Sequence, residues 1–195
     1  VGFSEISSNT ISNITNDGIH VFQTGRVNVT GNSIDTVGGN GVYVQNTVTK
    51  RPSISVTENT IRNAGGSGIR ATYFQQSAVA NNVIHTTAVH GISIDVSTDV
   101  GVNGNTVRDH VVYGIIVEDS DTYAMAGNVV HGNGASLVGY YLLSRGQVSR
   151  ANEVTGCVTA WSGTYRLYQG TAPASGTWQV GDIVYYTAPA TGLPI

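Results

Sequence analysis

The strongest constraint on this chain is a repeat of about 23 residues that runs from its first residues to about residue 155. An asparagine is followed two positions later by Ile or Val, and its successive steps are 23, 27, 23, 23, 23 and 24 residues. A glycine keeps a second register, nine residues after each of the first five asparagines. Such a period is typical of a solenoid, in which each unit buries its apolar face against the next. The asparagines are Asn9, Asn32, Asn59, Asn82, Asn105, Asn128 and Asn152, and the glycines are Gly18, Gly41, Gly68, Gly91, Gly114 and Gly139.

The segments that follow the glycine predict strands. "GIHVF", "GVYVQ", "GISID" and "GIIVE" alternate apolar and other residues and are rich in Ile and Val. Leucine-rich repeats need a leucine frame, which is absent, and helical repeats need about 33 residues or more. The prediction is an all-β parallel β-helix of about seven coils over residues 1–156. The recurring Asn is expected to adopt the left-handed bend between strands and to form a hydrogen-bonded ladder, and the Gly to allow a bend at the next strand.

Composition excludes several classes of partner. Charged residues make up 11% of the chain, against roughly 25% in an average globular protein, and the net charge is −3 with Lys50 as the one lysine. We therefore expect no nucleic-acid partner, and the short apolar runs predict no membrane insertion. The single cysteine and the His spacing predict no metal site, and we expect no cofactor. Because the repeat is already under way at Val1, we expect the chain to be a piece of a longer protein.

The repeat resembles the right-handed parallel β-helices of the pectate-lyase-like superfamily over about Val1 to Thr155, and this resemblance implies the right-handed sense. Residues 157–195 have a different rhythm, and "GTWQVGDIVYYTAP" predicts a strand pair around a Gly-Asp turn, hence a small C-terminal β segment. The stretch from about Tyr165 to Gly192 is similar to a segment near the C-termini of phage tail and tailspike proteins. The combination resembles a bacteriophage tailspike. It implies an extracellular homotrimer on the virion that recognises, and often cleaves, bacterial surface polysaccharide.

Strand alternation places two columns of equivalent residues on an outer face, two and four positions after the glycine. In the second column, Asp95 and Glu118 should be neighbours in successive coils. A glycosidase uses one carboxylic acid and one carboxylate, so we predict these two as catalytic residues, with a solvated surface pair as the alternative. The predicted substrate-binding residues on the same face are His20, Tyr43, Gln45, Arg70 and Tyr141. The columns are His20, Tyr43, Arg70, Ser93, Ile116, Tyr141 and Phe22, Gln45, Thr72, Asp95, Glu118, Leu143.

Two further features keep other functions open. Four residues are inserted near "QNTVTKRP", which would form a lip over the face that bears Asp95 or a harmless loop. Three positions after the recurring Asn lies a column rich in His and Arg, which could serve a polysaccharide lyase or epimerase or simply be solvated. The hypotheses are thus a glycoside hydrolase, a non-catalytic receptor-binding or shaft segment, and a secreted lyase or epimerase. The third column is Ser12, Asp35, Arg62, His85, Arg108, His131 and Thr155.

Overall fold

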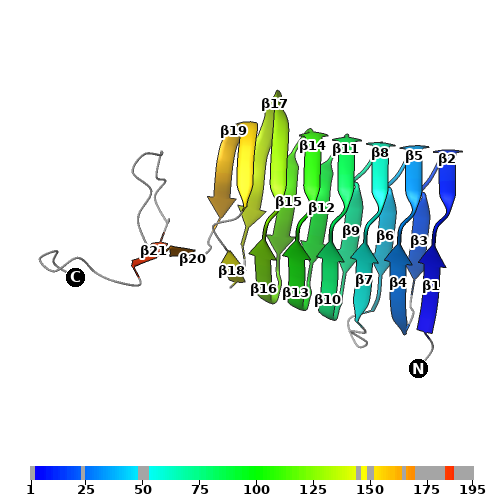
Figure 1. Cartoon of the computed structure of the whole chain (residues 1–195), viewed down its shortest axis with the longest axis horizontal. Helices are drawn as coiled ribbons and strands as arrows, with labels where there is room; N and C mark the ends of the chain where they lie inside the picture. Colours follow the sequence, from blue (N-terminus) through cyan, green and yellow to red (C-terminus); the bar gives the residue numbers. More distant parts are fainter. Residues whose placement is uncertain are drawn as a thin grey trace, which may run out of the picture.

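Three short strands per coil wind into a parallel β-solenoid, as the repeat predicts, and the solenoid has about six turns where about seven were expected. The computed structural model describes residues 3–22, 25–47, 53–143, 146–148, 152–163, 166–169 and 183–186, and these contain no helix. Figure 1 shows the coils side by side along the long axis, with β1–β3 at one end and β19 at the other. Every strand pairs in parallel with its equivalent one coil away, so residues that are equivalent in the repeat are also neighbours in space.

The strands form three faces. The first consists of β1 (Phe3–Ser7), β4 (Arg26–Thr30), β7 (Ile54–Thr57), β10 (Gln75–Ala80), β13 (Thr98–Asn103), β16 (Asp121–Ala126) and β18 (Gly146–Val148), continued by β20 (Arg166–Gln169) and β21 (Ile183–Tyr186). The second consists of β2 (Thr10–Ile14), β5 (Ser33–Val37), β8 (Thr60–Ala64), β11 (Val83–Thr87) and β14 (Thr106–His110). The third consists of β3 (Ile19–Phe22), β6 (Val42–Gln45), β9 (Ile69–Thr72), β12 (His90–Asp95) and β15 (Tyr113–Glu118). β17 (Val129–Leu142) joins the second and third faces, and β19 (Glu153–Gly163) pairs with it.

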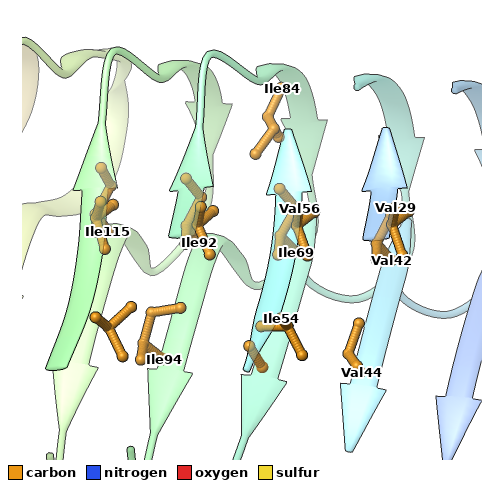
Figure 2. Close-up of a cluster of buried hydrophobic side chains, with 14 of the residues drawn as sticks. Val29, Val42, Val44, Ile54, Val56, Ile69, Ile84, Ile92, Ile94 and Ile115 are labelled. Atoms are coloured by element: carbon orange, nitrogen blue, oxygen red, sulfur yellow. The ribbon is translucent and has the colours of Figure 1, made fainter. Parts of the chain in front are cut away.

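The interior is a continuous stack of aliphatic side chains. Ile92 and Ile94 of β12 lie directly beside Ile115 and Val117 of β15, and all four are buried. Figure 2 shows how Ile side chains from successive coils, such as Ile69, Ile92 and Ile115, follow one another along the axis. Burying one such side chain contributes about 1.5–3 kcal/mol, and no single coil could bury its own.

The predicted asparagine ladder is confirmed. The Nδ2 of Asn82 donates to the Oδ1 of Asn105 at 2.9 Å, and the Nδ2 of Asn105 donates to the Oδ1 of Asn128 at 2.9 Å. The backbone N–H of Asn82 also donates to Asn105 Oδ1, and that of Asn105 donates to Asn128 Oδ1. Each Nδ2 donates in addition to a backbone carbonyl, as that of Asn82 does to Val56 O. The ladder is unbroken from Asn9 to Asn152, and it keeps its geometry across the 27-residue step.

The structural reasons for the Asn and the Gly differ from those expected. The left-handed residue is the one before each ladder Asn from Asn9 to Asn128, for example Asn81 at φ 56° and Gly104 at φ 65°, whereas the ladder Asn residues are not left-handed. The recurring Gly is required by close packing rather than by a bend. A Cβ on Gly91 would lie 2.2 Å from the Cγ1 of Val107 and 2.5 Å from the carbonyl oxygen of Gly114.

Parts of the sequence predictions fall outside the described residues. Of the inserted loop, residues 48–52 are not described, so the lip stays a prediction. Ile183–Tyr186 is a strand, as "DIVYY" predicts, and it pairs in parallel with β20; the rest of "GTWQVGDIVYYTAP" lies outside the described residues. β19 runs through the expected boundary between residues 156 and 157, and the division into two domains stays a prediction.

Candidate functional site

The third face carries both predicted outer columns, and the register of its strands confirms that their members are successive neighbours. Asp95 pairs with Glu118, and Thr72 with Asp95. Arg70 lies between Tyr43 and Ser93, which places it one coil from Asp95. The first column therefore runs through His20, Tyr43, Arg70, Ser93, Ile116 and Tyr141, and the second through Phe22, Gln45, Thr72, Asp95 and Glu118.

The pKa values of the Asp95 and Glu118 carboxyl groups are both raised. Both side chains are half-buried, and burial is the main cause that raises the pKa of each. The charge of Asp119 raises the pKa of Asp95 further, and the charges of Asp95 and Asp119 raise that of Glu118. Arg70 opposes both shifts, and the backbone N–H of Val96 also favours the ionised form of Asp95. The site thus holds two carboxyl groups that compete for ionisation.

Aromatic and cationic groups continue along the same face toward β3. The rings of His20 and Tyr43 are stacked with centroids 4.8 Å apart, and the guanidinium of Arg70 lies 5.2 Å from the centroid of Tyr43. The Nδ1 of His20 is 3.4 Å from a carboxylate oxygen of Asp17. The half-buried Gln45 lies two coils from Asp95, with Thr72 between them. These predicted binding residues therefore lie in line with the carboxyl pair.

Sequence analysis missed a second aromatic stack, formed by His90, Tyr113 and Tyr141. The rings of His90 and Tyr113 lie 5.0 Å apart, and those of Tyr113 and Tyr141 lie 4.6 Å apart, all nearly parallel. His90 and Tyr113 immediately precede the recurring Gly, whereas the columns were read only after it. Reading one position before the Gly would have found them, in the series Asp17, Asn40, Ser67, His90, Tyr113 and Val138.

One apolar residue of the outer columns is buried. Ile116 belongs to the first outer column, yet only 3% of its surface is accessible. Tyr141 is the register partner of Ile116, and its ring stacks on that of Tyr113. Leu143, the last residue of the second outer column, has 47% of its surface accessible.

His90 is an uncharged group at the edge of this face. Burial, with smaller effects from the charges of Arg70 and His110, lowers the pKa of His90 to about 4. Its Nδ1 is buried and makes no hydrogen bond to any residue that the structure describes. Arg70 therefore acts on the ionisation of His90, Asp95 and Glu118 at once, which places these four side chains in one electrostatic neighbourhood.

The described residues contain neither a cluster of metal-binding side chains nor a helix that could span a membrane. In the part of the chain that the structure describes, no three His, Cys, Asp or Glu side chains gather closely enough to hold a metal ion. The described residues also include no helix of the length and apolar character needed to cross a membrane.

Comparison with known proteins bears on the fold of this region. The family model described as "Right handed beta helix region" matches residues 2–164, which include every strand that contributes to the third face. The searches of curated proteins and of solved structures found no match.

Proposed function

Because this chain belongs to the right-handed β-helix family, whose domains commonly bind or process carbohydrates, we propose that its third face binds and hydrolyses a bacterial surface polysaccharide. The observation that carries the proposal is the placement of Asp95 and Glu118, as register neighbours with raised pKa values, on a face that also carries two aromatic stacks. Phage tailspikes are the class of protein that we favour.

The two stacks supply a binding platform parallel to the solenoid axis. From Tyr43 to Tyr141 the register makes four coil steps, which is about 19 Å at about 4.8 Å per strand spacing. Sugar rings have apolar faces that pack on aromatic rings, and their hydroxyl groups hydrogen-bond to amides and guanidinium groups. A glycan lying along this platform would pass over Asp95 and Glu118.

The surroundings of the two carboxyl groups support different roles for them. Asp95 has two groups that favour its ionised form, Arg70 and the N–H of Val96, whereas Glu118 has only Arg70. We assign Glu118 as the general acid that protonates the leaving oxygen and Asp95 as the carboxylate that attacks the sugar carbon. Neighbouring strands lie about 4.8 Å apart, and retaining glycosidases hold their carboxyl groups about 5–5.5 Å apart, so retention of configuration is expected.

The C-terminal resemblance supports the choice of a tailspike. A β-helix followed by a stretch, from about Tyr165 to Gly192, that is similar to a segment of phage tail proteins supports the proposals of a homotrimer and of a place on the virion. The neutral surface, rich in hydroxyl and amide groups, suits a sugar ligand. The exposed Leu143 is a residue that a neighbouring subunit would cover.

One observation favours a lyase or epimerase as the second candidate. His90 is neutral at physiological pH, and it lies in the electrostatic reach of Arg70. An Arg that neutralises a uronate carboxylate and a neutral base that removes the adjacent carbon-bound proton are the groups that β-elimination needs. A lyase forms a double bond in its product, whereas a hydrolase adds water, so the products distinguish the two reactions.

The test is to incubate the purified chain with a panel of bacterial surface polysaccharides and to follow reducing ends and the absorbance of unsaturated uronates. We expect reducing ends without unsaturated products. Asp95→Asn and Glu118→Gln should each lower the rate by about 10²- to 10⁴-fold, the range of general acid–base catalysis, with binding retained. Glu5→Gln, which neutralises an exposed carboxylate on β1 of the first face, is the matched control.

The other outcomes each reject part of the proposal. Unsaturated products that disappear in His90→Gln would establish the lyase reaction instead. Binding without cleavage would establish a receptor-binding or shaft segment. Cleavage that persists in both carboxylate variants would show that the catalytic residues lie elsewhere.

A further inference from the structure

The backbone bends sharply directly after each of the two carboxyl residues of the third face. Val96 follows Asp95 with φ 47°, and Asp119 follows Glu118 with φ 46°, so both lie in the left-handed region. For a β-branched residue such as Val this conformation is an outlier, and strain of this kind persists only where the surrounding structure holds it in place. The contacts around Val96 must therefore fix its bend.

A buried serine closes each of these bends. The Oγ of Ser97 donates to the carbonyl oxygen of Asp95 at 2.9 Å, and the Oγ of Ser120 donates to that of Glu118 at 2.8 Å. Both serines are buried. In each coil the hydroxyl thus spans the left-handed residue and ties the two sides of the bend together.

The two serines also connect one coil to the next. The backbone N–H of Ser97 donates to the Oγ of Ser120 at 3.1 Å, and the Oγ of Ser97 accepts the backbone N–H of Phe74 at 3.3 Å. Hydrogen bonds through the two serines therefore link the carbonyl of Asp95 to that of Glu118. The two bends, and the carboxyl residues before them, are held in a fixed relation.

The bend at Val96 places a donor beside the Asp95 carboxylate. The N–H of Val96 donates to the carbonyl oxygen of Glu118 at 3.3 Å, and it also favours the ionised form of Asp95. Of the other charged groups that act on Asp95, Arg70 on β9 favours ionisation and Asp119, just after β15, opposes it. A backbone that relaxed at Val96 would move its N–H away from the carboxylate.

We propose that Ser97 is a positioning residue, which holds the bend at Val96 so that the N–H of that residue faces the Asp95 carboxylate. Ser120 supports Ser97 and keeps Glu118 at its spacing in the next coil. Because both serines are buried, they act through the backbone of the carboxyl residues and not on the substrate. This inference rests on the proposed function, in which Asp95 attacks the sugar carbon and Glu118 protonates the leaving oxygen.

The first face offers a matched control in Ser77, which has the same local structure without a carboxyl group. The Oγ of Ser77 donates to the carbonyl oxygen of Gln75 at 3.0 Å, and the intervening Gln76 is left-handed at φ 50°. The same Oγ accepts the backbone N–H of Ile54 at 3.0 Å, and Ser77 is buried. Ser77→Ala and Ser97→Ala should therefore destabilise the chain similarly, so any further difference between them reports on the carboxyl pair.

The experiment follows the Asp95 side-chain carboxyl group of the full chain by NMR as the pH is varied. In Ser97→Ala the pKa of Asp95 should rise further, because its ionised form loses the N–H of Val96. On a polysaccharide that the wild type cleaves, kcat should fall about tenfold with KM little changed, since positioning acts on the reacting groups. The acid limb of the rate profile should move to higher pH, because Asp95 must be ionised to attack. Ser77→Ala should leave the titration and the rate unchanged.

An unchanged Asp95 titration in Ser97→Ala, or an equal change in Ser77→Ala, would overturn the inference. Should Ser97→Ala fail to fold, Ser97→Thr, which keeps the hydroxyl, should titrate like wild type and Ser120→Ala should not; the reverse result would also overturn it. The titration needs no substrate. A chain that cleaves no polysaccharide would therefore reject the proposed function alone, and the titration would still decide the role of Ser97.

Discussion

The interior of the solenoid and the outer surface of its third face are built from the same strands, yet they vary in opposite ways. Inside, each coil repeats the previous one, with Ile92 and Ile94 over Ile115 and Val117 and with one ladder Asn per coil. Outside, the same strands carry a different residue at every step, from Tyr43 to Arg70 to Ser93.

The difference follows from what each side must contact. An interior side chain meets its own equivalent in the next coil, so a residue that fits once fits in every coil. An outer side chain meets solvent or a ligand, and its neighbours leave it free to vary. The interior therefore determines the fold, and the places where the outer columns depart from neutral polar residues are where function is to be sought.

The largest effect is expected from breaking the interior repeat at Asn82. Its Nδ2 donates to Val56 O and Asn105 Oδ1, and its Oδ1 accepts two hydrogen bonds from Asn59. Asn82→Ala leaves these buried groups without partners, and each such group costs about 1–3 kcal/mol, so we expect a loss of about 3–5 kcal/mol in unfolding free energy. Denaturant unfolding measures it. Asn28→Ala, at an outward position of β4, should change stability little; an equal loss there would contradict the role of the ladder.

A smaller loss is expected from adding one methyl group inside. In Gly91→Ala the new Cβ would lie 2.2 Å from Val107 Cγ1 and 2.5 Å from the backbone oxygen of Gly114, which cannot move independently. We expect a loss of about 2–3 kcal/mol, measured by thermal and denaturant unfolding. In Gly101→Ala the nearest atom is the mobile Nδ2 of Asn103 at 3.0 Å, so this control should remain near wild type. Equal stability of the two variants would refute close packing as the reason for the Gly.

The contrast between the repeated interior and the variable outer surface also explains which features could be predicted from the sequence. The spacing of Asn and Gly predicted the parallel coils, the core and the Asp95–Glu118 register, because each depends only on translation from one coil to the next. The stack of Tyr113 on Tyr141 was not predictable in this way. Tyr113 is level with Val138 in the sheet, and its ring leans toward a residue of another column. Such a contact depends on side-chain direction, which a repeat period does not specify.

A third prediction concerns pH and tests the environment of His90. The pKa of His90 is about 4 in the folded chain and about 6.5 when unfolded, so the unfolded state binds more protons between these values. The contribution of neutral His90 to the free energy of unfolding should be fully present above about pH 6.5. It should be lost as the pH is lowered toward 4, and the loss should be no more than about 2 kcal/mol because the ring is partly solvated.

The measurement compares wild type with His90→Gln across this pH range. The comparison is needed because burial also lowers the pKa of His110, whereas the raised pKa values of Asp95 and Glu118 act in the opposite sense as pH falls. The stability difference between wild type and variant should shrink toward pH 4. A difference that is independent of pH would show that His90 contributes only packing.

The smallest effect is expected at Tyr113, where the outer surface itself is tested. Its ring stacks on His90 and Tyr141, so Tyr113→Ala removes the centre of one aromatic stack. An aromatic contact contributes about 0.5–1.5 kcal/mol beyond area burial, so glycan affinity should fall about three- to tenfold in calorimetry. Phe22→Ala removes an exposed aromatic ring of the same face that lies outside both stacks, and it should bind like wild type. If Phe22→Ala weakens binding as much as Tyr113→Ala, then exposed aromatic area in general, and not the stack, holds the ligand.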